Sequence, residues 1–210
     1  MLQQYYEIDK IEVGIDEAGR GCLFGPVCVA SVIWLDKDPI TNNKKYILKD
    51  SKKVSEKNRN ILRTYIEDHS ILFNVQFIDN NYIDKHNILN STLDGMHKCL
   101  DNIVNSIKID TILIDGNQFK PYFDVDSNLI PYRCIIDGDN TYKSIACASI
   151  LAKTYRDEYI NNLVKEYPEL KKYDIHNNKG YGTSNHIDAI HKYGITKWHR
   201  QSFGICKEYV

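Results

Sequence analysis

Three short apolar segments each lead into an acidic residue that stands close to a glycine, and this pattern constrains the fold more than any other feature. We expect the segments to be β-strands that end at these acids. The segments and their acids are Glu12–Asp16 with Glu17, Thr111–Ile114 with Asp115, and Arg133–Ile136 with Asp139. In an open α/β sheet, strand ends are where ligands bind. The sequence therefore predicts a fold in which three strand ends bring carboxylates together.

Carboxylates that converge in this way repel one another unless a cation lies between them. Mg²⁺ and Mn²⁺ prefer oxygen ligands, and two such ions roughly 4 Å apart can catalyse phosphoryl transfer. Taken alone, Asp115 and Asp139 are better explained as ordinary turn or cap residues. The adjacent Asp16 and Glu17 are harder to explain without a cation, because buried charges need a partner. The residues by themselves indicate a metal-dependent phosphoryl-transfer enzyme.

The remaining sequence alternates predicted strands and helices. The strand Val27–Leu35 follows a glycine-rich turn closely enough to pair antiparallel with the first strand. The other predicted elements are a helix from its N-cap Ser55 to Asp68, a strand Ile71–Ile78, two helical pieces within Ile83–Ile107, a helix Ser144–Tyr167, a helix Ser184–Tyr193 and a short helix within Trp198–Lys207. This order predicts an α/β fold, a mixed sheet with helices on its faces. We assign residues 1–167 to its core and 168–210 to a C-terminal helical part of the same domain.

Composition narrows the class of protein. None of the apolar runs in the 210-residue chain approaches the roughly 18 residues that a membrane span needs, and the N-terminus lacks the pattern of a secretory signal. The six cysteines are scattered without a C-x-x-C pair, which argues against a zinc site and a disulfide framework. We therefore expect no membrane association and a reducing, cytoplasmic location.

Local charge is uneven although the net charge is only −1. Residues 44–63 and 171–207 are rich in Lys and Arg, and they flank the acidic stretch 79–126. Basic flanks around an acidic centre could bind phosphates beside a metal site. Solvated helix faces explain the same runs, and charge alone favours that explanation.

Groups of residues along nearly the whole chain resemble, in order, the type 2 ribonucleases H (the ribonuclease HII family). They are Gly14–Gly21 with Gly25–Val27, Asp50–Lys53, Asn87–Leu89, Ile114–Asn117, Gly138-Asp139, Ser144–Ile150 with Ala152-Lys153 and Arg156-Asp157, Lys179–Thr183 with His186, and His199-Arg200 with Ser202-Phe203. The resemblance implies an RNase H-like mixed sheet flanked by helices, with a C-terminal helical segment. It implies hydrolysis of RNA in RNA–DNA hybrids and at single ribonucleotides embedded in duplex DNA, as in ribonucleotide excision repair. The cut would fall 5′ of the ribonucleotide and leave a 3′-hydroxyl and a 5′-phosphate.

The resemblance also assigns roles to individual acids. Catalysis and metal binding fall on Asp16, Glu17, Asp115 and Asp139, with Mg²⁺ or Mn²⁺ as the cofactor. The neighbouring Asp137 is set aside, because Asp139 has the family's position.

Substrate binding falls on two glycines, an arginine, a tyrosine and two lysines. Glycines let the backbone approach a ribose, whose 2′-OH both donates and accepts hydrogen bonds; an ordinary tight turn explains them equally well. The tyrosine role, stacking near the RNA–DNA junction, comes wholly from the resemblance, and an exposed basic loop is an equally good explanation of the lysines. The residues are Gly19, Arg20, Gly21, Tyr181, Lys52 and Lys53.

Two further groups match the family pattern but have simple structural explanations. Lys153, Arg156 and Asp157 share a helix face by their spacing and are expected to pair with one another. His186 and His199 are best explained as ordinary hydrogen-bonded or surface histidines.

The expected partner is nucleic acid, namely an RNA–DNA hybrid or a duplex that contains ribonucleotides. We expect a monomer without a clear sliding-clamp motif, and an N-terminus too short for the extra domain of ribonuclease HIII. Two alternatives stay open. Another two-metal nuclease on the same fold, such as a junction resolvase, would cut all-DNA substrates, and a hybrid-binding protein would bind without turnover.

Overall fold

A five-stranded mixed sheet forms the centre of the molecule. The computed structural model describes residues 2–34 and 54–210. The strands are β1 (Glu12–Ala18), β2 (Val27–Ile33), β3 (Leu72–Ile78), β4 (Thr111–Asp115) and β5 (Tyr132–Ile135), in the order β3-β2-β1-β4-β5. The first three strands pair antiparallel, and β4 and β5 run parallel to β1. The predicted mixed α/β sheet is confirmed.

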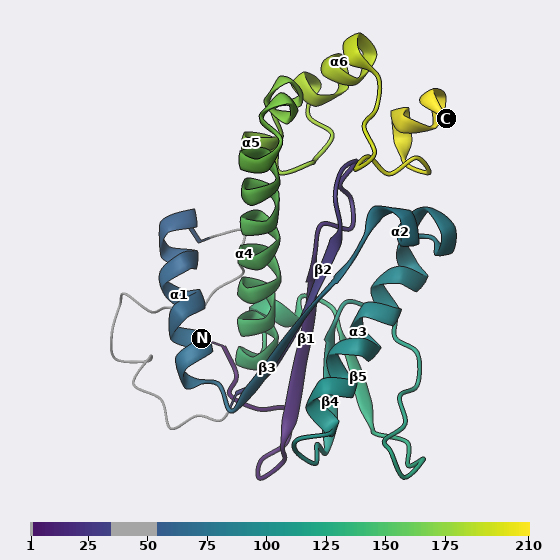
Figure 1. The fold of residues 1–210 in the computed structure, drawn as a ribbon. Helices are drawn as coiled ribbons and strands as arrows, with labels where there is room; N and C mark the ends of the chain where they lie inside the picture. The colour runs from purple at the N-terminus through teal and green to yellow at the C-terminus, as the bar shows by residue number, and fades with distance from the viewer. Residues whose placement is uncertain (1, 35–53) are drawn as a thin grey trace.

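Helices cover both faces of this sheet (Figure 1). On one face α3 (Ile88–Val104) packs against alternate residues of β1, among them Val13 and Ile15. On the other face lie α1 (Glu56–His69) and α4 (Lys143–Glu166). A Cβ atom at Gly14 would lie 2.3 Å from the backbone carbon of Ser144, so only glycine lets the start of α4 approach β1 this closely. Side chains alternate along a strand, which puts Asp16 on the α4 side.

Local signals set several of the helix ends. Ser55 accepts a hydrogen bond from the backbone N–H of Asn58, as expected of an N-cap. The predicted pair of helical pieces is confirmed as α2 (Asn80–His86) and α3. Asn87 separates them in a backbone conformation with φ of 63°, and its side chain caps α3.

Some predicted boundaries are wrong. β1 does not end at Asp16 but continues through Glu17 to Ala18, and β5 ends at Ile135, one residue before its predicted end. Asp139 follows no strand directly; it lies in a short 3-10 helix, η4 (Gly138–Asn140). Leu35 and the candidate lysines, Lys52 and Lys53, lie outside the described residues.

The C-terminal part packs beyond one end of the sheet, at the top of Figure 1. It contains η5 (Pro168–Tyr173), α5 (Ile175–Asn178), α6 (Ser184–Tyr193) and η6 (Gly204–Tyr209). The short helix predicted within Trp198–Lys207 is a 3-10 helix, which begins only at Gly204 and extends to Tyr209. A buried cluster joins this part to the end of α4 and to Phe24, in the turn after β1.

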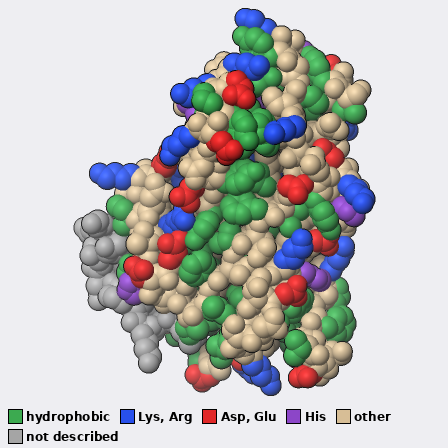
Figure 2. Space-filling view, in the orientation of Figure 1, with side chains coloured by type: hydrophobic (Ala, Val, Ile, Leu, Met, Phe, Trp, Pro, Cys, Tyr) green, Lys and Arg blue, Asp and Glu red, His purple; other side chains and the backbone are tan. Residues whose placement is uncertain are grey.

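The surface over this part carries both charge signs. Figure 2 shows Lys and Arg side chains mixed with acidic ones at the top of the molecule, so this face is not an unbroken basic patch. Among the described residues, no helix has the length and apolar character needed to cross a bilayer.

Candidate active site

Asp16 and Asp115 lie side by side because β1 and β4 pair in parallel register. Ile15 lies opposite Ile114 in this pairing, and the next residue of each strand is an aspartate. Asp16 is buried, with 5% of its surface exposed. Burial raises the pKa of Asp16 well above its usual range, and the charges of Glu17 and Asp115 raise it further. The site thus places the buried carboxyl group of Asp16 next to two other carboxylates.

Two hydrogen bonds hold the Asp16 carboxylate in place. It accepts one from the backbone N–H of Glu17, at 2.7 Å, and one from the side chain of Ser149. Both lower the pKa of Asp16, but burial and the neighbouring charges outweigh them. Ser149 was not singled out from the sequence, because only the packing of α4 against β1 reveals its partner.

The η4 turn brings Asp139 to the same edge of the sheet. The backbone N–H of Gly138 donates to Oδ1 of Asp115 at 2.8 Å. A Cβ atom at Gly138 would lie 2.7 Å from Ile145 and 3.2 Å from that oxygen, so a side chain there would disturb the contact. Asp139 is buried and accepts from the Asn140 amide at 3.2 Å. Asp137, by contrast, is exposed.

Glu17 faces a cation of the following loop. Its carboxylate lies 3.3 Å from the guanidinium of Arg20, whose side chain is about half exposed. An ion pair this open to solvent contributes little to stability.

The chemistry of these acids fits a hard cation, although their present arrangement is not a closed cage. In the part of the chain that the structure describes, no group of three or more His, Cys, Asp or Glu side chains is gathered to hold a metal ion. Carboxylate oxygens are the ligands that Mg²⁺ and Mn²⁺ prefer, and a cation would relieve the charge that raises the pKa of Asp16.

The two glycines of the loop after β1 differ in what they require. Gly19 is buried with φ of +92°, and a Cβ atom there would lie 2.0 Å from Nε of Arg156. Gly21 is exposed, and a Cβ atom there would meet nothing within 4 Å. Packing explains Gly19, whereas the fold gives no steric reason for a glycine at position 21.

Two buried arginines hold this loop. Arg156 donates to the carbonyls of Phe24, Pro26 and Lys179 at 3.0, 2.9 and 2.8 Å. Arg200 donates to the carbonyls of Arg20 and Gly25 at 2.8 and 2.9 Å, and burial lowers the pKa of its guanidinium to about 10. We call these two residues the arginine clamp.

The arginine clamp was not predicted. Arg156 was expected to pair with Asp157, which is wrong; Asp157 instead pairs with Lys153 at 2.8 Å and with Arg59 at 3.9 Å. The partners of the two arginines lie more than 100 residues away along the chain for most of these bonds, so helical spacing contains no signal for them.

Tyr181 lies against the loop with 41% of its surface exposed. Its side chain hydrogen-bonds that of Cys22, and the backbone N–H of Leu23 donates to Gly180 at 2.8 Å. The Nζ atom of Lys153 lies 5.8 Å from the centre of the tyrosine ring. The structure thus brings an accessible aromatic ring together with the Gly19–Gly21 segment, as stacking on a base would need.

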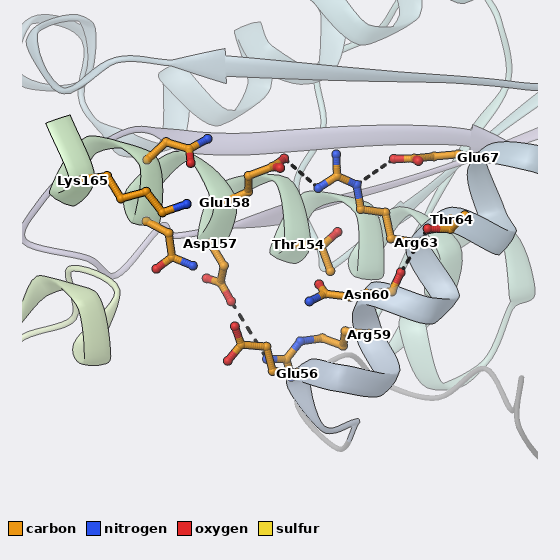
Figure 3. A pocket seen from close by; sticks show the side chains of 12 residues that line it. Glu56, Arg59, Asn60, Arg63, Thr64, Glu67, Thr154, Asp157, Glu158 and Lys165 are labelled. Carbon is orange, nitrogen blue, oxygen red and sulfur yellow. Dashed lines mark hydrogen bonds and ion pairs between the residues drawn. The ribbon is translucent and has the colours of Figure 1, made fainter.

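A cavity of about 440 Å³ lies elsewhere, between α1 and α4 (Figure 3). Its charged residues are largely paired: Arg63 contacts Glu67 at 2.7 Å and Glu158 at 2.8 Å. None of the four candidate acids lines it, so it is separate from the candidate site.

The family model that matches the chain, over residues 13–206, is described as Ribonuclease HII. A ribonuclease HII of Christiangramia forsetii is 47% identical over 202 residues, which cover 96% of this chain and 94% of that protein.

Solved structures are similar in fold at lower identity. The ribonuclease H2 from Pyrococcus horikoshii OT3 superposes with a TM-score of 0.73 at 21% identity, over 94% of this chain and 96% of that one. Bst-RNase HIII in complex with Mn²⁺ superposes with a TM-score of 0.71 at 18% identity, over 95% of this chain and 69% of that one.

Proposed function

The chain belongs to the ribonuclease HII family, and from this membership we propose that it hydrolyses the RNA strand of RNA–DNA hybrids and cuts 5′ of single ribonucleotides in duplex DNA. The products would carry a 3′-hydroxyl and a 5′-phosphate. The observation that carries the proposal is the buried Asp16 beside Asp115 and Glu17. The loop that follows these acids exposes Arg20 and Gly21.

Asp16, Glu17, Asp115 and Asp139 are the proposed metal ligands. When bound, Mg²⁺ or Mn²⁺ would supply a Lewis acid for the scissile phosphate and lower the pKa of the attacking water. Asp16 would be held for this role by Ser149 and by the backbone of Glu17. The N–H of Gly138 would orient Asp115, because hydrogen-bonded ligands are fixed in direction.

The proposed reader of the sugar is the backbone of Gly19–Gly21. Open space at Gly21 supports this role, since the backbone there is accessible and no neighbour demands a glycine. Arg20 is exposed, and its guanidinium can bind phosphate with two hydrogen bonds. Tyr181 would stack on the neighbouring base pair.

Finer expectations belong to the same proposal. Lys52 and Lys53 would contact the phosphate backbone. The protein would act as a monomer in the cytoplasm, and its six free cysteines support a reducing compartment.

The test compares cleavage of a hybrid, a duplex with one ribonucleotide and plain duplex DNA, each with Mg²⁺ and with Mn²⁺. We expect cutting of the first two substrates and not of the third. Cutting of plain DNA would instead favour another two-metal nuclease, and binding without product in either metal would favour a non-catalytic protein.

The variant Gly21→Ala sharpens this test. Its Cβ atom meets open space, so the melting temperature should stay at the wild-type value while cleavage of the ribonucleotide substrates falls. Unchanged cleavage would contradict a close approach of this backbone to the ribose.

A further inference from the structure

Two buried histidines form a continuous hydrogen-bonded chain that ends at the backbone of Tyr181. His186 and His199 are 0% and 1% exposed. Their Nε2 atoms lie 3.1 Å apart. At one end of the chain, the backbone N–H of Thr196 donates to Nδ1 of His199 at 2.9 Å. At the other end, Nδ1 of His186 lies 2.9 Å from the carbonyl oxygen of Tyr181.

This chain has only one consistent assignment of protons. Nδ1 of His199 accepts from Thr196, so its proton must be on Nε2. The carbonyl of Tyr181 can only accept, so His186 carries its proton on Nδ1. The Nε2–H of His199 therefore donates to the bare Nε2 of His186. Both rings are neutral, and every bond runs in the same direction, from Thr196 to Tyr181.

The backbone of His199 connects the chain to the loop after β1. His199 forms an antiparallel bridge with Phe24. On either side of it, the N–H of Gly25 donates to the carbonyl of Trp198 at 2.9 Å, and the N–H of Arg200 donates to the carbonyl of Leu23 at 2.8 Å. His199 thus contacts the loop through its backbone and reaches Tyr181 through its side chain and His186.

We infer that His199 and His186 are positioning residues, which hold Tyr181 at a fixed place relative to the loop that contains Gly19–Gly21. The inference rests on the proposed function, because it concerns two elements that would contact the substrate together. The carbonyl of Tyr181 also accepts from the N–H of Thr183 at 2.8 Å, so this carbonyl is fixed by two donors. Loss of the histidine donor would leave this carbonyl with the N–H of Thr183 alone and would loosen the placement of the ring against the loop.

The decisive experiment is a double-mutant cycle that combines His199→Asn with Tyr181→Ala. The asparagine oxygen keeps an acceptor for Thr196 but removes the Nε2–H that donates to His186. With wild-type Tyr181, we expect His199→Asn to lower kcat/KM on the single-ribonucleotide duplex roughly tenfold, through coupling of residues in one network. In the Tyr181→Ala background the same substitution should change kcat/KM less than twofold.

Equal losses in both backgrounds would overturn the inference, because they would show that His199 acts through general stability. Full activity of Tyr181→Ala would contradict the proposed role of Tyr181 itself, and a wild-type protein that cuts no ribonucleotide substrate would contradict the proposed function. These three failures are distinguishable.

A matched pair at His186 tests the same contact from the other side. His186→Asn keeps a donor for the carbonyl of Tyr181, whereas His186→Leu keeps none, so the asparagine variant should retain more activity. Equal activity of the two variants would contradict the inference.

One readout needs no substitution. A long-range ¹H–¹⁵N spectrum of the wild-type protein should show His199 with its proton on Nε2 and His186 with its proton on Nδ1. The opposite tautomers, or a charged imidazolium at neutral pH, would contradict the chain.

Discussion

The acid site and the arginine clamp both bury charge, but they balance it in opposite ways. Asp16 is buried beside two other carboxylates, and their charges raise its pKa. Arg156 and Arg200 are fully buried, and their guanidinium groups donate to backbone carbonyls of the loop after β1 and of Lys179. Backbone carbonyls accept most of the hydrogen bonds that the two guanidinium groups can donate, whereas the charges that act most strongly on Asp16 are those of neighbouring carboxylates.

This difference separates the two roles. A region whose charges are compensated by protein groups stabilises the fold. A region whose charges repel one another costs stability and can bind a ligand of opposite charge. Substitutions at the acids should therefore remove activity while preserving the fold. Substitutions at the arginine clamp should remove stability first.

The largest expected effect is that of Asp16→Asn on cleavage. Loss of a direct ligand should lower kcat by at least about 100-fold, since even groups that only orient a ligand change metal affinity or activity by 10–100-fold. Without added metal, the free energy of unfolding should rise, because a repelled carboxylate becomes neutral. Single-turnover cleavage and urea unfolding measure the two quantities. A variant that cuts at the wild-type rate would contradict the claim that Asp16 serves activity rather than the fold.

The next effect is that of Arg156→Met on stability. This change leaves the carbonyls of Phe24, Pro26 and Lys179 without their donor. We expect the free energy of unfolding to fall by roughly 3 kcal/mol, since hydrogen bonds to charged groups contribute about 1.5–3 kcal/mol each and partial repacking returns some of the loss. Urea unfolding at neutral pH measures it. A loss below that of an exposed control, such as Lys165→Met, would mean that the arginine clamp does not hold the loop.

A smaller effect is the contribution of His199 to the pH dependence of the free energy of unfolding. Burial lowers the pKa of His199 from 6.5 to about 3, and the neighbouring His186 lowers it as well. Below pH 6.5 the imidazole of His199 binds a proton in the unfolded chain but stays neutral in the folded protein. The free energy of unfolding should therefore fall as the pH falls from about 6.5 toward 3, by up to about 1.4 kcal/mol per pH unit from this residue.

The variant His199→Asn isolates this contribution. Urea unfolding of both proteins between pH 7.5 and pH 5 (about the range in which histidine titrates) gives the difference, from which the other titrating groups cancel. The variant should show the shallower dependence. The same slope for both proteins would contradict a buried neutral His199.

The smallest effect is that of Arg20→Gln on stability. Arg20 pairs with Glu17 at 3.3 Å but is about half exposed, and exposed pairs contribute about 0–1 kcal/mol. Thermal unfolding should shift little, and less still at high salt. A large loss of stability would mean that Arg20 stabilises the fold, as the arginine clamp does, rather than serving mainly to contact substrate.

The sequence predicts one of these regions far better than the other. The strands that lead to Asp16 and Asp115 follow from apolar runs, and Ser55 follows from local capping chemistry. The register that makes Asp16 and Asp115 neighbours needs only a parallel pair of strands. Local pattern is less reliable at the turn that contains Asp139, because a 3-10 turn after a strand has no periodic signal.

The arginine clamp and the histidine chain could not be predicted in this way. The arginines donate mostly to carbonyls more than 100 residues away, and the two histidines meet across 13 residues. Helical spacing indicates only near pairs, such as Lys153 and Asp157. Burial of an arginine is favourable only when the folded chain supplies acceptors. For this reason the resemblance to a family indicates that these residues matter, but only the structure indicates what they contact.

The most direct test of the account is thermal unfolding under Mn²⁺ titration, with wild-type protein and Asp16→Asn compared side by side. A ligand that binds the folded state raises the melting temperature by mass action. The account predicts a rise for the wild-type protein that grows with Mn²⁺ concentration, and little or no rise for Asp16→Asn. Equal rises for the two proteins, or no rise for either, would contradict the claim that these carboxylates share a cation.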